Sequence, residues 1–207
     1  MTIRAVVFDF GGVLFDWSPQ HLYRKLIADD VERQWFLDTI CTQDWNTEQD
    51  AGRSLAEATR TLVAQYPEHT TLIQAYYERW PEMLRAELPE GVAILEALHQ
   101  VEMPLFGLTN WSAETFPYAR ANYPFLTRFR DILVSGEVKL IKPDPAIYHA
   151  SLSQVREHLP DIQASEVVFI DDVAGNIEAA IALGWQGIHH VSAERTAARL
   201  RELGVAF

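Results

Sequence analysis

The sequence contains very little cysteine and no long apolar segment. Its 207 residues include a single cysteine, Cys41, so the chain cannot form an intramolecular disulfide, which fits a reducing compartment. The first apolar run is too short for the core of a secretory signal and is interrupted by Asp9. No run reaches the length that crosses a bilayer. We therefore expect a cytoplasmic protein that does not associate with membranes.

Basic residues are also scarce. The 17 lysines and arginines stand against 29 aspartates and glutamates, which gives a net charge of −12, and they form no cluster. Because nucleic acids and anionic membranes attract basic surfaces, neither is an expected partner. The same charge repels anionic metabolites, so a phosphate site in this chain needs a local lysine or metal ion. Linkers, low-complexity tracts and internal repeats are absent too, which suits one large domain or two small ones.

Short apolar runs alternate with helical patterns along most of the chain. The runs, predicted to be strands, are residues 5–8, 104–108, 167–170, 186–190 and, more weakly, 132–134. The helical patterns cover residues 91–100, 113–122, 145–154, 175–183 and 193–203. This alternation predicts an α/β fold with a parallel, doubly wound sheet. Ligands bind to such sheets beyond the carboxyl ends of the strands.

The stretch from residue 17 to residue 88 differs from the rest because it has no convincing strand. It holds helical patterns, separated by breaks near residues 29–30, 45–52 and 67. These patterns cover residues 21–28, 32–40, 55–65 and 70–85. We therefore predict a core formed by residues 1–16 and 89–207, with residues 17–88 inserted as a small helical domain over the sheet.

Polar residues that suit phosphoryl chemistry gather in four segments, most of them at the ends of predicted strands. In chain order the segments are Asp9-Phe10-Gly11-Gly12-Val13-Leu14, Leu108-Thr109-Asn110, Lys142-Pro143-Asp144-Pro145 and Phe169-Ile170-Asp171-Asp172-Val173-Ala174-Gly175-Asn176. Each segment alone has an ordinary interpretation, such as a helix N-cap or a turn. Their joint occurrence in this order favours an active site.

The four segments supply complementary chemical groups. Asp9 can attack phosphorus and form an acyl phosphate. Asp171 and Asp172 can hold a hard cation such as Mg²⁺, which prefers carboxylates, water and the substrate phosphate as ligands. Lys142 and the Thr109 hydroxyl can donate hydrogen bonds to the phosphoryl oxygens. The set predicts a magnesium-dependent hydrolase of a small phosphorylated metabolite.

In order and spacing, these segments resemble the four motifs of the haloacid dehalogenase superfamily, and the resemblance extends from Val6 to about Gly187. It implies a Rossmann-like, three-layer core with a parallel sheet, and a helical-bundle cap inserted after the first motif. It also implies that Asp9 is the nucleophile, with Thr109 and Lys142 as the other catalytic residues. The implied Mg²⁺ ligands are Asp9, the carbonyl of Gly11, Asp171 and Asp172. Asn176 falls where the family has a supporting polar group.

One position departs from the family pattern. Most phosphatases that the chain resembles carry a second aspartate two residues after the nucleophile, which protonates the leaving group, whereas this chain has Gly11. Proton transfer of this kind contributes about 10²–10⁴ in rate. Another carboxyl group can replace the missing one, and Asp16, Glu48 and Asp50 are candidates. Alternatively, the leaving group needs little help, or the protein has lost its activity.

The chain also looks like bacterial α-glucose-1-phosphate phosphatases, which share the glycine at this position and an aspartate corresponding to Asp16. This resemblance implies an active enzyme that acts on a sugar 1-phosphate. The expected substrate-binding residues are Thr109, Asn110, Lys142, Asp16 and Trp45. The chain is expected to act as a monomer or homodimer.

Two alternatives remain open. A metal-independent 2-haloacid dehalogenase would use Asp9 to attack carbon, but Asp171 and Asp172 would then lie beside it as unneutralised like charges. A catalytically weakened binding module on the same fold would explain Gly11. The charge argument favours the phosphatase.

Overall fold

The computed structural model describes residues 2–207. Five parallel strands form the central sheet, in the order β5-β4-β1-β6-β7. Their bounds are β1 Ala5–Phe8, β4 Leu105–Thr109, β5 Asp131–Val134, β6 Val167–Asp171 and β7 Gln186–His189. This order places β1 in the middle of the sheet, between β4 and β6.

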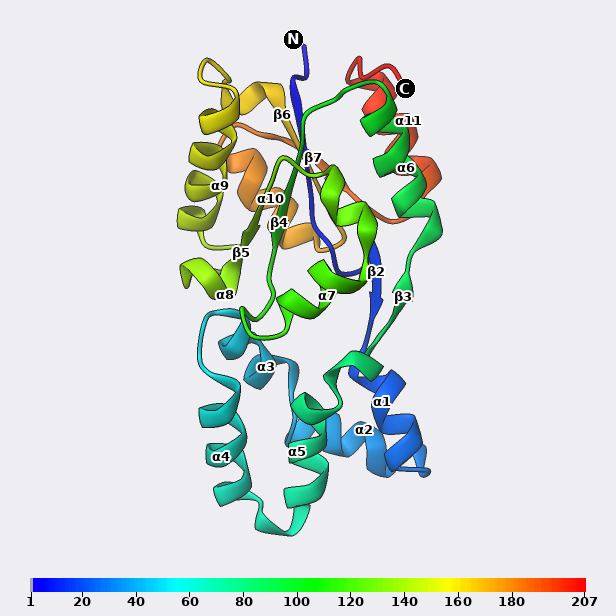
Figure 1. Cartoon of the computed structure of the whole chain (residues 1–207), viewed down its shortest axis with the longest axis vertical. Coiled ribbons are helices and arrows are strands. Elements are labelled where there is room, and N and C mark those ends of the chain that lie inside the picture. The colour runs from blue at the N-terminus through cyan, green and yellow to red at the C-terminus, as the bar shows by residue number, and fades with distance from the viewer. Residues whose placement is uncertain (1) are drawn as a thin grey trace.

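Helices cover both faces of the sheet (Figure 1). On one face lie α6, α7 and α11, and on the other lie α9 and α10. The helices of this part of the chain are α6 Pro89–Gln100, α7 Phe116–Asn122, α8 Ser135–Val138, α9 Pro145–His158, α10 Ala174–Ala182 and α11 Ala193–Glu202. Short 3₁₀ turns occupy η3 Pro124–Arg128 and η4 Ala164–Glu166. The three-layer α/β fold predicted from the sequence is confirmed.

Strand β1 shows how the apolar run at the start of the chain builds two cores. All four of its residues are buried, and successive side chains point to opposite faces of a strand. Val6 and Phe8 pack in the core under α6 and α11, whereas Ala5 and Val7 pack in the core under α9 and α10. A continuous apolar run therefore suits this central position, because helices cover both faces.

A second group of helices lies at one end of the molecule, away from the sheet (Figure 1). Its elements are α1 Pro19–Leu26, α2 Asp30–Thr39, α3 Gln43–Asp50, α4 Leu55–Gln65, η1 Pro67–His69, α5 Thr70–Glu78 and η2 Trp80–Glu82. We call helices α1 to α5 the cap. Tyr23 and Tyr76 are fully buried at its centre, with their ring centroids 6.1 Å apart.

The structure corrects the prediction that residues 17–88 contain no strand. β2 (Phe15–Trp17) and β3 (Leu84–Glu87) pair antiparallel and connect the cap to the core. The helix predicted over 70–85 ends at Glu78, and its last predicted residues belong to η2 and β3. Strands this short, whose partners lie about 70 residues apart, leave no periodic pattern in the sequence.

The predicted break at residues 45–52 is also wrong, because Gln43–Asp50 forms helix α3. The Thr42 side chain caps this helix by accepting a hydrogen bond from the Trp45 N–H at 3.0 Å. The helix has no apolar stripe. Its residues 43, 46, 47 and 50 share one face by their spacing, and all four line the cavity described below.

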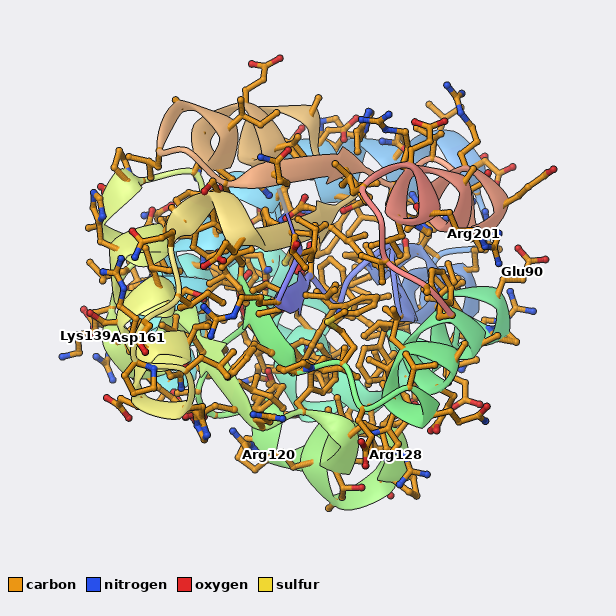
Figure 2. The ribbon with its side chains drawn as sticks, turned by 90° about the horizontal axis from the view of Figure 1, so that it is seen from above. Glu90, Arg120, Arg128, Lys139, Asp161 and Arg201 are labelled. Atoms are coloured by element: carbon orange, nitrogen blue, oxygen red, sulfur yellow. The ribbon has the colours of Figure 1, made fainter. Side chains whose placement is uncertain are left out.

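Charged side chains lie around the outside of the molecule. Figure 2 shows Glu90, Arg120, Arg128, Lys139 and Arg201 projecting outward from the ribbon, and all five are exposed. Across residues 2–207, no helix is long and apolar enough to cross a membrane.

Candidate active site

Three polar strand ends meet at the centre of the sheet. Asp9 directly follows β1, Thr109 ends β4 and Asp171 ends β6. Because Phe8 pairs with Gly107 on one side and with Ile170 on the other, the chain register brings these ends side by side. All three residues are buried. The convergence predicted from the sequence is therefore present in the fold.

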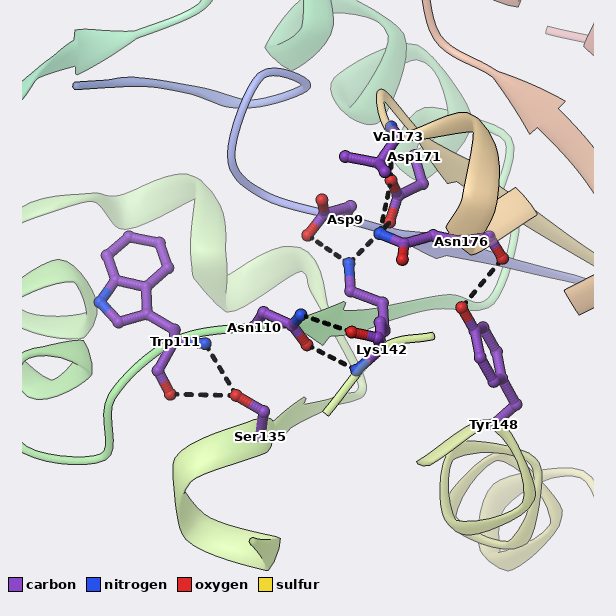
Figure 3. A network of polar contacts seen from close by, with 9 residues as sticks. All are labelled: Asp9, Asn110, Trp111, Ser135, Lys142, Tyr148, Asp171, Val173 and Asn176. Carbon is purple, nitrogen blue, oxygen red and sulfur yellow. Dashed lines mark hydrogen bonds and ion pairs between the residues drawn. The ribbon is translucent and has the colours of Figure 1, made fainter. Parts of the chain in front are cut away.

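Lys142 lies between two of the carboxylates (Figure 3). Its Nζ is 2.9 Å from Asp9 Oδ1 and 2.7 Å from Asp171 Oδ2. The lysine side chain is 1% exposed, so this cation is held inside the site. Burial alone would lower the pKa of Lys142, but Asp9 and Asp171 outweigh it and the pKa is raised. Lys142 therefore stays charged.

Asp171 is held by a full set of donors. Its Oδ1 accepts from the backbone N–H of Val173 at 2.7 Å, and the Asn176 amide donates to both carboxylate oxygens at 3.0 Å. Tyr148 in turn donates to the Asn176 carbonyl at 2.9 Å. These bonds fix the carboxylate's orientation before any ligand arrives, as a preorganised site requires.

The cluster carries more negative charge than Lys142 can balance. One carboxylate oxygen from each of Asp9, Asp171 and Asp172 lies within 4.8 Å of the others. Burial raises the pKa of Asp9 to about 8, because Lys142 only partly offsets the desolvation and Asp171 adds repulsion. Oxygen ligands with this excess charge fit a hard divalent cation. These three residues can therefore hold a metal ion, which would favour ionised Asp9.

Thr109 is a buried donor without a partner. Its side-chain Oγ1 finds no hydrogen-bond partner among residues 2–207, although the residue is only 1% exposed. A buried hydroxyl left unpaired is costly. Its position at the end of β4, beside Asp9, suits a hydroxyl that donates a hydrogen bond to a bound ligand.

Asn110 makes two hydrogen bonds to the backbone of Lys142. Its Oδ1 accepts from the Lys142 N–H at 2.9 Å, and its Nδ2 donates to the Lys142 carbonyl at 3.1 Å (Figure 3). The two bonds tie the loop after β4 to the loop that carries the lysine. Asn110 therefore positions Lys142 and also lines the cavity.

The two glycines after Asp9 differ. Gly12 has a left-handed φ of 67°, and a Cβ there would lie 2.2 Å from Asp172 Oδ2. Only glycine fits this turn without displacing the Asp172 carboxylate. A Cβ on Gly11 would meet nothing within 4 Å, so the backbone leaves room for a side chain at that position.

A cavity of about 350 Å³ opens between this cluster and the cap. Its floor includes Asp9, Gly11, Lys142 and Asp172. Its aromatic walls come from Trp17, Tyr77, Trp80 and Trp111. Polar groups reach it from α3 and from the loop after β4, namely Gln43, Asn46, Thr47, Asp50, Ser112 and Thr115. The mixed lining can hold a small molecule that has a polar and an apolar part.

Three of the substrate-binding residues predicted from the sequence, Thr109, Asp16 and Trp45, do not line this cavity. Thr109 is buried at the end of β4. Asp16 lies on β2, where its Oδ1 is 2.8 Å from His21 Nε2 and its Oδ2 is 3.8 Å from Arg85. Trp45 lies on α3 and packs against Tyr76 and Tyr77 inside the cap, with ring centroids 5.1 and 5.3 Å away.

Part of the cavity wall was not predicted from the sequence. The missed residues include Trp111, Ser112 and Thr115, which follow the Thr109-Asn110 segment closely. Their closeness in sequence to that segment could have identified them as lining the cavity. Tyr77 gave no signal, because its position on α5 becomes relevant only when the cap packs over the core.

The chain matches known proteins over most of its length. A model of haloacid dehalogenase-like hydrolases matches residues 3–184. The sesquiterpene phosphatase astK of Aspergillus oryzae is 26% identical over 202 residues, covering 98% of this chain and 97% of that protein.

Solved structures share the fold at lower identity. The enzyme BT-2542 of Bacteroides thetaiotaomicron, an Asp12Ala mutant in complex with magnesium and inorganic phosphate, superposes with a TM-score of 0.66 at 20% identity, covering 90% of this chain and 93% of its own. The L-2-haloacid dehalogenase of Xanthobacter autotrophicus superposes with a TM-score of 0.59 at 18% identity, covering 100% of this chain and 85% of its own. The family match spans four of the five strands of the central sheet and all four polar segments, so the chain belongs to the haloacid dehalogenase-like hydrolases.

Proposed function

We propose that this hydrolase is a Mg²⁺-dependent phosphatase that cleaves a small phosphate monoester through an aspartyl-phosphate intermediate on Asp9. The observation that carries the proposal is the charge arrangement. Asp9, Asp171 and Asp172 cluster together, and one buried cation, Lys142, pairs with Asp9 and Asp171 near the unpaired hydroxyl of Thr109. Excess carboxylate suits a metal, and the two donors suit phosphoryl oxygens.

In the proposed reaction, a carboxylate oxygen of Asp9 attacks phosphorus and the bond to the leaving oxygen breaks. Lys142 and Thr109 donate hydrogen bonds to the equatorial phosphoryl oxygens, where charge develops. Water then cleaves the acyl phosphate and restores Asp9. A Mg²⁺ ion held by Asp9, Asp171, Asp172 and the Gly11 carbonyl would neutralise charge on the phosphoryl group.

The proposed substrate is a sugar 1-phosphate, because aromatic walls suit the apolar faces of a sugar ring while Gln43, Asn46 and Thr47 offer hydrogen bonds. The same walls suit a prenyl chain, and the relative from Aspergillus is named a sesquiterpene phosphatase. Both classes therefore belong in a substrate screen. As part of this proposal, residues 17–88 act as a cap that selects the substrate.

The charge count also separates the phosphatase from the dehalogenase alternative. A metal-independent dehalogenase would leave three carboxylates with one ammonium group, an arrangement that raises the pKa of the nucleophile it needs ionised. A binding module would share this geometry, and turnover on the substrate panel distinguishes it from the phosphatase.

The test is phosphate release from a panel of sugar 1-phosphates, prenyl phosphates and aryl phosphates, with Mg²⁺ and with EDTA. We expect release with Mg²⁺, none with EDTA, and a loss of at least about 10³-fold in Asp9→Asn. Mg²⁺ should also raise the thermal midpoint of the wild type, because it binds only the folded state. Full turnover by Asp9→Asn, or halide release from 2-chloropropionate in EDTA, would contradict the proposal.

A further inference from the structure

Among residues 2–207, three carboxyl groups line the cavity, and one of them lies outside the cluster of Asp9, Asp171 and Asp172. Asp9 and Asp172 belong to the cluster, whereas Asp50 reaches the same cavity from the end of α3 in the cap. Gly11, two residues after the proposed nucleophile, has no side chain and cannot supply a proton. A proton donor for the leaving group must therefore come from another element.

The Asp50 carboxyl is held between the cap and the core. Asn46, one turn earlier on α3, donates to its Oδ2 at 3.0 Å. The backbone N–H of Ser112 also hydrogen-bonds it, and Ser112 lies three residues after Thr109 in the loop that follows β4. Asp50 is thus anchored on the loop that directly follows Thr109, the proposed phosphoryl-binding residue.

A polar network keeps this part of α3 in place. Tyr77 donates to Asn46 Oδ1 at 3.0 Å, and Gln49 donates to the Tyr77 hydroxyl at 2.8 Å. Ser135 of the core donates to the backbone carbonyl of Asp50. The carboxyl group is therefore fixed relative to the core, as a proton donor must be.

The other two candidate acids are placed elsewhere. Asp16 faces His21 and Arg85 on the β2–β3 side, and Glu48 is 61% exposed in its ion pair with Arg53. Neither residue lines the cavity.

We propose that Asp50 is the general acid and base of this active site, supplied by the cap in place of the acid that Gly11 cannot provide. This role rests on the proposed phosphatase function. As Asp9 attacks phosphorus, the electron pair of the breaking P–O bond moves to the leaving oxygen, which takes the Asp50 proton and departs as an alcohol. In the second step the Asp50 carboxylate accepts a proton from the water that attacks the acyl phosphate. The products are phosphate, free Asp9 and reprotonated Asp50.

The electrostatics agree with this role. Burial raises the pKa of Asp50 to about 7, with the Ser112 N–H opposing the shift. The ionisable groups around it are Tyr76 and Tyr77 on α5, Arg53 after α3, and Lys139 after α8, whose side chain approaches Gly52. A carboxyl group that titrates near neutral pH can both give and take a proton.

The experiment compares Asp50→Asn with wild type on phenyl phosphate and p-nitrophenyl phosphate, with Glu48→Gln as the matched control on the same helix. Phenol is the poorer leaving group and needs the proton more. We expect kcat/KM to fall about 10²-fold or more for phenyl phosphate in Asp50→Asn and less than about 10-fold for p-nitrophenyl phosphate. Glu48→Gln should change neither value. Equal losses on both substrates, or no loss, would overturn the role of Asp50.

A second measurement does not depend on turnover. Carboxyl ¹³C NMR of the metal-free wild type should show one aspartate outside the Asp9 cluster that titrates near pH 7, and selective labelling with Asp50→Asn should assign it. A titration of Asp50 near pH 4 would overturn the role. If wild type releases no phosphate from any ester in the panel, the proposed function itself fails, and the role of Asp50 falls with it.

Discussion

At the scale of single residues, the site depends on small differences between neighbours. Gly11 and Gly12 are adjacent, yet one leaves open space and the other lies against Asp172. Asn110 and Asn176 are both amides, but one holds the backbone of Lys142 and the other holds the carboxylate of Asp171. Two predictions follow from the glycines.

Gly12→Ala should weaken metal binding. The left-handed backbone costs an alanine about 1–2 kcal/mol, and its Cβ would displace the Asp172 carboxylate. We expect a thermal midpoint several degrees lower and a roughly tenfold higher Mg²⁺ concentration for half-maximal stabilisation, measured by thermal melts across a Mg²⁺ titration. Gly11→Ala is the control, because its Cβ meets nothing within 4 Å, and it should bind Mg²⁺ like wild type.

Gly11→Asp should restore a proton donor where Asp50 has been removed. The open space at Gly11 admits the new side chain, which would lie two residues from Asp9, the proposed nucleophile. In an Asp50→Asn background, we expect this change to raise kcat/KM for phenyl phosphate at least about tenfold. The control is Gly11→Asn in the same background. Equal activity of the Asp and Asn variants would show that the position cannot supply the proton.

At the scale of secondary structure, two short helices join the cap to the core. The end of α3 meets α8, where Ser135 donates to the Asp50 carbonyl and accepts from the Trp111 N–H at 2.9 Å. Gly136 beside it leaves no room for a Cβ, which would lie 2.5 Å from the Ala113 nitrogen. This contact brings the polar face of α3 to the cavity.

Ser135→Ala should destabilise the protein because it leaves the buried Trp111 N–H without its acceptor. An unsatisfied buried donor costs about 1–3 kcal/mol, which corresponds to a thermal midpoint lower by roughly 2–10 °C in a chain of this size. Ser153→Ala on the exposed side of α9 is the matched control and should shift the midpoint by little. A midpoint equal to that of wild type would show that the contact contributes nothing to stability.

At the scale of the whole molecule, buried carboxyl groups make the stability of the fold depend on pH. A carboxyl group whose pKa is raised by folding keeps its proton in the native state after the unfolded state has lost it. The unfolded state then binds fewer protons, so the free energy of unfolding falls as pH rises between the two pKa values. For Asp50 this window runs from the ordinary aspartate pKa of 3.8 to a pKa of about 7.

The metal-free wild type should therefore lose stability relative to Asp50→Asn as pH rises from about 4 to about 7. We expect the two thermal midpoints, measured in EDTA, to differ least at pH 4 and most above pH 7, with Asp50→Asn the more stable at high pH. Parallel curves for the two proteins would mean that Asp50 has its ordinary pKa in the folded state.

Much of this protein was predictable from local sequence. The alternation of apolar runs and helices led to the three-layer sheet, because burial of both sheet faces leaves a continuous apolar pattern. The strand-end residues Asp9, Thr109 and Asp171 converge because parallel strands end at one edge. The four segments also led to the family, which the match over residues 3–184 confirms.

Other features required the tertiary structure. Asp16 and Trp45 were predicted from the sequence to bind substrate. In the structure Asp16 faces His21 and Trp45 faces the cap aromatics, so neither lines the cavity. Helix α3 was missed because its polar face lines the cavity, so no apolar stripe identifies it. Sequence alone thus predicted the central sheet and the acidic cluster of Asp9, Asp171 and Asp172, since these depend on local patterns. Only the packing of cap on core decided which distant residues, Asp50 among them, reach the cavity, because that depends on long-range contacts.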